Sequence, residues 1–377
     1  MESFDPALVQ RGARLRRSPY FEATQRAGCR GYTVYNHMLL PIAYDAPEAE
    51  YQRLLTGVTL WDVAVERNVE ISGSDAMRFA ELLTPRDLSR CPVGHGRYVL
   101  LTDEAGGIVN DPVLLRVEEN RFWLACADSD VLLWAKGLAH GARLKVELRE
   151  LDVAPLQIQG PRSREVIRAL FGNAVSDLEY YQFVRLELQK IPIILTRTGW
   201  TGELGYELYL LEPARGAELW ERVMQAGRPF GLAPAGPSDI RRIEAGILNY
   251  GVDMTLDTNP YEVGLERLVH LDKPAQFVGR DALRRIAASG AARRLVGVEI
   301  GGERLDLNMT RWPVRGGGQV TSAVYSPRLK KNIGYALVPI EQARNGAKLE
   351  VETPDGPRPA LVVPMPFVEP RSRACES

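Results

Sequence analysis

Cysteine and histidine are few and scattered in this sequence of 377 residues. The four cysteines are Cys29, Cys91, Cys126 and Cys375, and no two of them form a C-x-x-C pair. The four histidines are His37, His95, His140 and His270, and the sequence has no H-E-x-x-H motif. These patterns argue against a disulfide framework and a structural zinc site. We therefore expect no metal, whereas a Cys–His pair brought together only by the fold stays open.

The sequence also lacks an excess of charge and a long apolar run. With 47 basic and 48 acidic residues, the net charge is −1, which gives no basic surface for nucleic acid. No apolar stretch approaches the roughly 20 residues that a membrane-spanning helix needs. The first ten residues, MESFDPALVQ, are acidic and polar where a signal peptide would be basic and then apolar. We expect a cytoplasmic protein that contacts neither nucleic acid nor membrane.

Strand and helix patterns alternate through the first 280 residues. Strands are expected at 69–71, 97–102, 108–117, 121–127, 153–160, 191–200 and 206–211. Helices are expected within 72–83, with Ser74 or Asp75 as the N-cap, and at 131–142, 161–172, 217–227 and 238–247. The glycine-containing turn at 103–107 predicts a hairpin. This mixture predicts an α+β fold.

The character of the sequence changes after Arg280. Short strands separated by glycine, proline and asparagine are expected at 294–300, 318–326, 332–339, 347–353 and 358–365. Such a series is typical of a small β-barrel or sandwich. We place a domain boundary in the polar segment 280–292.

The strongest local feature is RTGWTGELGYELYL, residues 197–210. Glu207 and Tyr209 lie two residues apart on the expected strand, so their side chains point to one face. A carboxylate beside aromatic rings such as Trp200 suits a flat heterocycle that carries N–H donors. The alternative is an ordinary hairpin with a surface glutamate.

A second feature is EAGGIVNDPVLLRV, residues 104–117. Asn110 and Asp111 interrupt an apolar pattern, and polar side chains are costly to bury without partners. Pro112 biases Asp111 toward an extended backbone. Asp111 is therefore a candidate site residue, or else an exposed carboxylate at a strand end.

Three other segments leave two interpretations open. The run 32–38, with Tyr35 and His37, could line a pocket for a methylated, polarisable group or pack in the core. The segment 61–71 carries Glu66 and Arg67, which could form an ion-paired strand edge. Arg328 belongs to a basic turn that could meet an acidic cofactor tail or lie in solvent.

Read together, nine segments resemble one family over about residues 18–370. They are WDV (61–63), ISGSDAMRFAELLTPRDL (71–88), GGIVNDPVLLRV (106–117), LQIQGP (156–161), RTGWTGELGYELYL (197–210), RRIEAGILNYGVDM (241–254), TNPYEVGLERLV (258–269), FVGRDAL (277–283) and TSAVYSPRLKKNIGYALVP (321–339). No single segment is decisive, but their order and spacing resemble the aminomethyltransferase, or glycine cleavage T-protein, family. The resemblance implies three domains arranged as a cloverleaf around a central opening, with a C-terminal β-barrel. Domain 1 would cover about 1–55 and 150–280, domain 2 about 56–149, and the barrel 281–377.

The resemblance also implies the cofactor and the site. Tetrahydrofolate would enter the central opening, with its pterin held by Glu207 and with Asp111 near the reactive N5 and the substrate. The cofactor-binding residues implied in this way are Tyr98, Asp111, Trp200, Glu207, Tyr209 and Arg328. Asp111 and Tyr209 would act in catalysis. The residues expected to contact the donor are Tyr35, His37 and Trp200.

Two departures from the family pattern refine the expected reaction. Asn110 stands where the aminomethyltransferases have an aspartate, and Ser238 stands where they have an arginine. The segment 16–41, together with WDVAVERNVEISG and VNDPVL, looks closer to the dimethylsulfoniopropionate demethylase branch. The resemblance therefore implies methyl transfer from a small-molecule donor to tetrahydrofolate by an enzyme that could form a homodimer. The alternatives are an aminomethyltransferase of glycine cleavage, a demethylase of N-methyl or O-methyl compounds, and a folate-binding protein without transfer.

Overall fold

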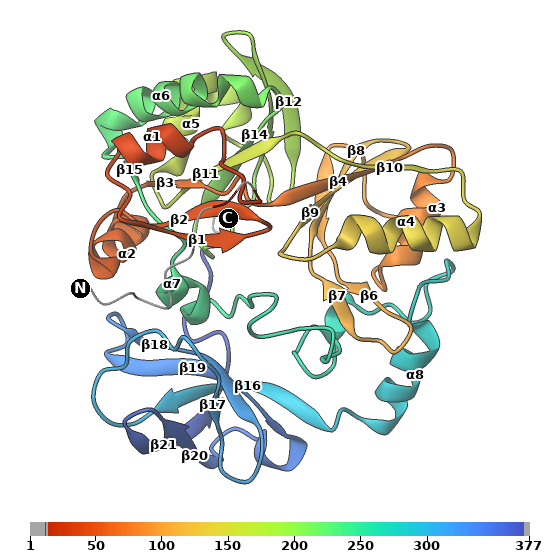
Figure 1. The fold of residues 1–377 in the computed structure, drawn as a ribbon, viewed down its shortest axis with the longest axis vertical. Helices are drawn as coiled ribbons and strands as arrows, with labels where there is room; N and C mark the ends of the chain where they lie inside the picture. The colour runs from red at the N-terminus through yellow and green to blue at the C-terminus, as the bar shows by residue number, and fades with distance from the viewer. Residues whose placement is uncertain (1–11, 13, 373–377) are drawn as a thin grey trace.

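A computed structural model describes residue 12 and residues 14–372. Two features of the sequence lie outside these residues. They are the first ten residues, whose pattern differs from that of a signal peptide, and Cys375. The chain forms three lobes around a central opening, and each lobe has its own β-sheet (Figure 1). No helix in the part of the chain that the structure describes is long and apolar enough to span a membrane.

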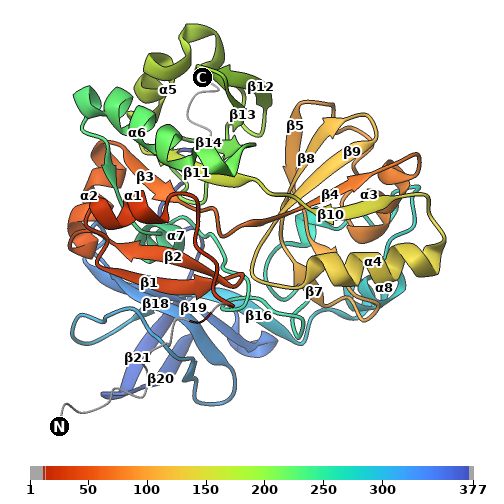
Figure 2. The ribbon, with the colours of Figure 1, turned by 45° about the horizontal axis from the view of Figure 1, so that its top comes forward.

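The first sheet has six strands in the order β12-β13-β14-β11-β3-β15. Their bounds are β3 (Thr59–Asp62), β11 (Ala154–Gln159), β12 (Phe183–Leu188), β13 (Ile191–Thr196), β14 (Gly205–Leu210) and β15 (Ala233–Pro234). The helices of this lobe are α1 (Phe21–Arg26), α2 (Pro47–Thr56), α5 (Ser163–Phe171) and α6 (Gly216–Gly227). Helices α5 and α6 cover the face of the sheet that points away from the opening (Figure 2). The hairpin of β1 (Gly31–Tyr35) and β2 (Met38–Ala43) lies beside it.

Strands β11 and β14 alternate between two environments. Leu156 and Ile158 of β11 and Leu208 of β14 pack in the helix-covered core. Gln157 and Glu207, which are directly paired across the two strands, point the opposite way and line a cavity. All six residues of each strand are buried, so the polar face needs partners within the protein.

The second sheet has five strands in the order β10-β4-β9-β8-β5. Their bounds are β4 (Arg67–Ser72), β5 (His95–Tyr98), β8 (Val113–Glu118), β9 (Arg121–Cys126) and β10 (Glu147–Glu150), with helices α3 (Ala76–Leu83) and α4 (Val131–Ala142). The single strand expected at 108–117 is instead β7 (Ile108–Asn110) followed by β8, and β7 forms a hairpin with β6 (Leu101–Thr102). The interruption falls at Asp111 and Pro112, because proline has no N–H for the ladder. Asp111 therefore lies between the two strands, outside their ladders, and lines a cavity.

The third sheet has six strands in the order β17-β18-β19-β16-β21-β20. Their bounds are β16 (Arg293–Ile300), β17 (Trp312–Pro313), β18 (Gln319–Ser326), β19 (Lys331–Pro339), β20 (Lys348–Thr353) and β21 (Gly356–Val363). A bridge between Val314 and Val351 joins the two edges, so the sheet is a nearly closed barrel. Helix α7 (Asp239–Glu244) precedes it in the chain and packs on β18 and β19.

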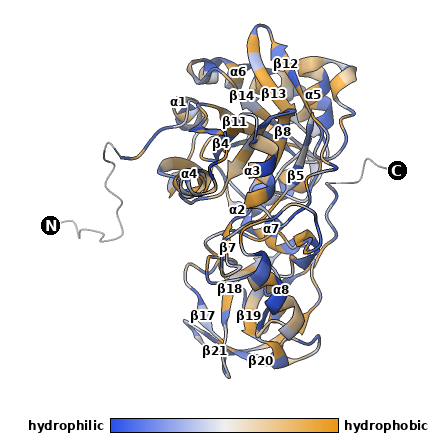
Figure 3. Cartoon of the chain, turned by 90° about the vertical axis from the view of Figure 1, so that its right-hand side faces the viewer, coloured by the Kyte–Doolittle hydropathy of each residue, from blue (hydrophilic) through white to orange (hydrophobic). Residues whose placement is uncertain are grey.

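Helix α8 (Arg280–Ser289) leads from the second lobe to the barrel. Its outward side is hydrophilic (Figure 3), whereas Ala282 and Leu283 are buried. The α+β mixture expected from the sequence is confirmed. β3 lies within the range expected for domain 2 but pairs in the first sheet, and the division into domains stays a prediction.

Gly160 follows β11 where two backbone segments meet. Its φ is +121°, and a Cβ atom there would lie 2.5 Å from the carbonyl oxygen of Gly57. We expect Gly160→Ala to lower the free energy of unfolding by about 2–3 kcal/mol, because backbone strain adds to a clash that no side-chain rotation relieves. Urea denaturation measures the loss. Gly172→Ala is the control, since Gly172 has φ +83° but no atom within 4 Å of its Cβ position; equal losses in both variants would contradict the clash.

Candidate active site

A cavity of about 2360 Å³ is lined by residues of all three lobes. Its wall includes residues of β5, β14, the loop after β13, the loop after α7 and the C-terminal segment 363–372. The residues expected at the site that line it are Tyr35, Tyr98, Asp111, Trp200, Glu207 and Tyr209. These residues come from segments far apart in the chain, and the fold brings them together at the cavity.

His37 and Arg328 do not line the cavity. His37 is exposed in the turn between β1 and β2, where its φ is +60°. Arg328 is exposed in the turn between β18 and β19, and its charge acts on the phenol of Tyr51. The structure thus brings together six of the eight residues expected at the site and leaves these two outside the cavity wall.

Glu207 has a dense set of hydrogen-bond donors. Its Oε1 accepts a hydrogen bond from Nε2 of Gln157, and its Oε2 accepts one from the hydroxyl of Thr198. The hydroxyls of Thr196 and Tyr209 each lie 3.4 Å from Oε2 and donate to it. Four neutral donors hold this buried carboxylate, and no cation from residues 14–372 pairs with it. Its position is fixed before any ligand arrives.

Burial raises the pKa of Glu207, while the hydrogen bonds from Thr198 and Gln157 act in the opposite direction. Glu66 also lines the cavity. Burial and, secondarily, the negative charge of Glu207 raise the pKa of Glu66 well above its usual value. Ion pairs form at the start of β4, as the sequence left open, because Arg67 pairs with Glu150 and Asp130. Within residues 14–372, Glu66 takes no part in them.

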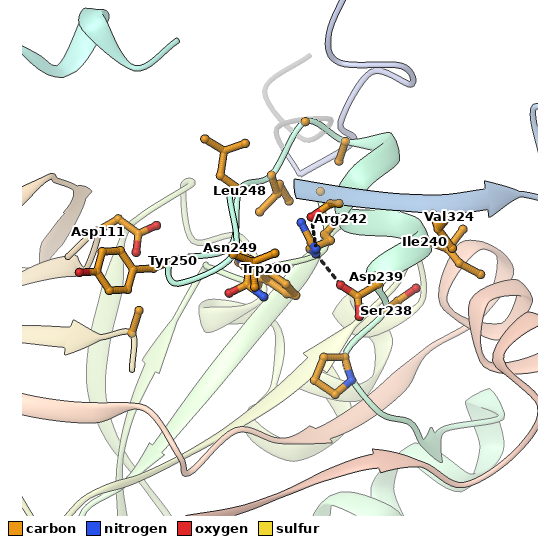
Figure 4. A pocket seen from close by; sticks show the side chains of 18 of the residues that line it. Asp111, Trp200, Ser238, Asp239, Ile240, Arg242, Leu248, Asn249, Tyr250 and Val324 are labelled. Carbon is orange, nitrogen blue, oxygen red and sulfur yellow. Dashed lines mark hydrogen bonds and ion pairs between the residues drawn. The ribbon is translucent and has the colours of Figure 1, made fainter. Parts of the chain in front are cut away.

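Asp111 lies on the opposite side of the cavity from Arg242, next to the ring of Tyr250 (Figure 4). Its Oδ2 accepts a hydrogen bond of 2.9 Å from the phenol of Tyr98. Burial raises the pKa of Asp111 to about 7, although the bond from Tyr98 lowers it. Burial and then the charge of Asp111 raise the pKa of Tyr250 to about 12 and that of Tyr35 further. Tyr98 thus bonds to the carboxylate, Tyr250 lies beside it, and Tyr35 lines the same cavity.

The ring of Trp200 packs against a buried cation. The guanidinium of Arg242 lies 5.7 Å from the centre of the Trp200 ring. Arg242 donates to Asp239 at 2.6 Å and to Asp253 at 2.8 Å, and Figure 4 shows it bonded to Asp239 beside Ser238. These bonds fix the guanidinium, so the Trp200 ring has a rigid backing.

The two departures from the family pattern have local structural roles. The Ser238 hydroxyl caps α7 by accepting a hydrogen bond of 3.3 Å from the backbone N–H of Arg241, and Ser238 lines the cavity. Asn110 is buried, and its side chain bonds to Ala127 and Ser129. The side chain at position 110 holds the loop after β9 and adds no second carboxylate to the cavity.

Gln157, Glu66 and Tyr250 line the cavity but were not singled out as site residues from the sequence. The signal for Gln157 was present, because a glutamine between Leu156 and Ile158 interrupts an apolar strand. For Glu66 the sequence indicates only a place in an ion-paired segment. Nothing local marks Tyr250, since its position depends on the path of the loop after α7.

The groups in the cavity fit a flat heterocycle with N–H donors. Oε1 of Gln157 is buried, has no hydrogen-bond partner in the described part of the chain, and lies beside the Glu207 carboxylate. A buried acceptor without a partner is costly, and a donor-bearing ring edge would satisfy both residues. Among residues 12 and 14–372, no cluster of three or more histidine, cysteine, aspartate or glutamate side chains is arranged to hold a metal ion.

Comparison with known proteins agrees with this architecture. The GCVT N-terminal domain model matches residues 20–273, and the glycine cleavage T-protein C-terminal barrel domain model matches residues 293–369. Dimethylsulfoniopropionate demethylase of Ruegeria pomeroyi is 38% identical over 353 residues, which cover 93% of this chain and 96% of that protein. The aminomethyltransferase of Bacillus mycoides is 32% identical over 364 residues, 94% of this chain and 98% of that one.

The fold is also found among solved structures. Glycine cleavage system aminomethyltransferase T from Bartonella henselae superposes with a TM-score of 0.85 at 26% identity, covering 95% of this chain and 99% of that one. The three-domain cloverleaf with a C-terminal barrel is thereby confirmed. The chain belongs to the glycine cleavage T-protein family, near its dimethylsulfoniopropionate demethylase branch.

Proposed function

We propose that this protein transfers a methyl group from a small sulfonium donor, with dimethylsulfoniopropionate as the first candidate, to tetrahydrofolate. The general reaction follows from the family: the chain is an enzyme that transfers a one-carbon group and uses tetrahydrofolate. The identity of the donor and the roles of individual residues are the proposal. The cytoplasmic location and the homodimer expected from the sequence stay predictions.

The observation that carries the proposal is the environment of Asp111. In residues 14–372 no basic side chain pairs with its carboxylate, and its one side-chain partner is the phenol of Tyr98. Tyr35 and Tyr250 complete an aromatic and acidic wall. A cation would supply the missing positive charge, and each aromatic face adds about 0.5–2 kcal/mol of cation–π attraction.

The residues of the chain have separate tasks in this reaction. Glu207 and Gln157 would hold the pterin edge, and Trp200 would supply a rigid aromatic surface near the reacting atoms. Tetrahydrofolate, when bound, supplies the nucleophilic N5. Asp111 would hold the cationic donor and stabilise the positive charge while it is redistributed. Alignment of two bound reactants can lower a barrier by about 7–11 kcal/mol, so positioning is the main work of the site.

The second candidate is aminomethyl transfer in glycine cleavage, which the 32% identity to an aminomethyltransferase keeps open. The two positions that differ from the aminomethyltransferase pattern, Asn110 and Ser238, favour the sulfonium donor. Ser238 offers a hydroxyl that is already engaged in capping α7, and Asn110 faces the loop at 127–129. Neither residue supplies the charge that the aminomethyltransferase pattern has at these positions.

The test is the product formed from each donor. We expect tetrahydrofolate and dimethylsulfoniopropionate to give 5-methyltetrahydrofolate by mass analysis, with little product from dimethylglycine, glycine betaine or methoxylated aromatics. Formation of 5,10-methylenetetrahydrofolate from an aminomethyl-lipoyl carrier, without sulfonium turnover, would establish the second candidate instead. As a control, 4-methylpentanoate has the shape of the donor without its positive charge, and it should inhibit at least about 10-fold more weakly than the donor binds.

A further inference from the structure

Three arginines line one side of the same cavity. Arg86 follows α3, Arg97 lies on β5, and Arg267 lies in the short 3-10 helix Glu266–Leu268. Burial lowers the pKa of Arg86, and the positive charges of Arg97 and Arg267 are close enough to lower it further. The second lobe, with Arg86 and Arg97, and the connection between α7 and α8, with Arg267, thus bring three positive charges together.

None of the three arginines pairs with a carboxylate within residues 14–372. Arg86 donates to the backbone oxygen of Tyr98, and Arg97 donates to backbone oxygens of Gly96 and Arg90. The acidic neighbour of Arg267 in the chain, Glu266, is engaged by Arg294 at 2.8 Å. Both Arg97 and Arg267 repel Arg86, so an anion entering between these cations would relieve the repulsion.

We propose that Arg86, Arg97 and Arg267 form a binding site for a carboxylate group of a ligand in the central cavity. Guanidinium groups are suited to this because their planar N–H forks match the two oxygens of a carboxylate. The existence of this site is inferred from the cavity alone, whereas the identity of its ligand rests on the proposed function. It also differs from the sequence-based prediction, which placed the acidic cofactor tail at Arg328, an exposed residue outside the cavity wall.

Both ligands of the proposed methyl transfer, tetrahydrofolate and the zwitterionic donor, carry a carboxylate that the arginines could bind. Tyr181 lines the cavity together with Glu207, and its backbone oxygen accepts a hydrogen bond of 2.7 Å from the N–H of Gly96, the neighbour of Arg97. A ligand held at Glu207 could therefore extend past Tyr181 to the arginines, as the aminobenzoyl-glutamate tail of tetrahydrofolate would. Tyr98 connects Asp111 to Arg86, through its phenol and its backbone oxygen respectively. A zwitterionic donor could therefore place its cation at Asp111 and its carboxylate at the arginines.

The experiment measures binding by calorimetry to the full chain and to its Arg97→Gln and Arg267→Gln variants. In the cofactor arm the ligands are 5-methyltetrahydrofolate and 6-methyltetrahydropterin, which lacks the tail. In the donor arm they are dimethylsulfoniopropionate and trimethylsulfonium, which lacks the carboxylate. Each variant should raise the Kd of the carboxylate-bearing ligand by about 10-fold and leave its carboxylate-free counterpart unchanged. The arm that shows this difference identifies the source of the carboxylate.

Arg285→Gln is the matched control, because Arg285 is exposed on α8 and does not line the cavity. The proposal is overturned if neither arm separates the two ligands, or if Arg328→Gln and not the cavity variants weakens the tail-bearing ligand. The tail alone, N-(4-aminobenzoyl)-L-glutamate, is a further probe in the cofactor arm. If the wild-type protein binds the tail and the arginine variants lose it while no methyl transfer occurs, the arginine site stands and the proposed function fails.

Discussion

Replacing Asp111 with asparagine is expected to lower kcat with the preferred sulfonium donor by about 10²–10³-fold, because a charge placed for the transition state is removed without a change in shape. The bond from Tyr98 can still be accepted by the amide oxygen, so the variant should fold. Stopped-time product analysis at saturating tetrahydrofolate measures the effect. Asp306→Asn is the control, since Asp306 lines the cavity but is exposed on the barrel side, and it should retain nearly full activity.

The pH dependence of the same reaction gives an independent test. Because the pKa of Asp111 is raised to about 7 in the free protein, the ionised form that binds a cation increases as the pH rises through 7. We expect kcat/KM to rise with pH and to level off above that value. In Asp111→Asn this acidic limb should disappear. An unchanged limb in the variant would assign the titration to another group, such as Glu66.

Stability should change in the opposite direction from activity. A carboxyl whose pKa is raised on folding stabilises the folded state fully below about pH 4, and that contribution is lost as the pH rises through 7. Asp111→Asn should therefore become more stable than the wild type as the pH increases. Urea denaturation of the unliganded proteins at about pH 5 and about pH 8 measures the difference. A variant less stable at the higher pH would show that the carboxylate is satisfied by partners in the protein.

Glu207→Gln is expected to raise the Kd of tetrahydrofolate by about 10- to 150-fold, which corresponds to the loss of a charged hydrogen bond. The amide keeps the shape of the side chain but turns one acceptor into a donor, and that donor faces the hydroxyl of Thr198 or the amide of Gln157. Titration calorimetry measures the affinity. Glu187→Gln on the exposed face of β12 is the control and should bind normally. An unchanged Kd in Glu207→Gln would remove the pterin-holding role.

The alternation of β14 could be predicted from the sequence because it is local. Glu207 and Tyr209 are two residues apart in a strand with strong apolar neighbours, so their common face follows from the strand period alone. Asp111 was equally local, since Pro112 follows it directly. The structure adds that this proline divides the expected strand in two. Local rules thus identified the carboxylates but not how their neighbours are arranged.

Residues that depend on long-range pairing could not be predicted in the same way. Gln157 meets Glu207 only because β11 pairs with β14 in one register, and a shift of one residue would turn Gln157 into the helix-covered core. Arg86, Arg97 and Arg267 come together from three separate segments. Conversely, His37 and Arg328 looked suitable by residue type, but their turns lie outside the cavity wall.

The connectivity of the first sheet bears on how the protein folds. Strand β3 is separated from its partner β11 by the whole second sheet, and the hydrogen bond between Thr59 and Gln159 spans 100 residues of chain. Contacts of such high sequence separation form slowly, because the entropy of closing the loop is lost before the contact is made. Placing β11 against both β3 and β14 is therefore expected late in folding. Substitutions that slow formation of the second sheet should delay the appearance of folate binding during refolding, even when they lie far from the cavity.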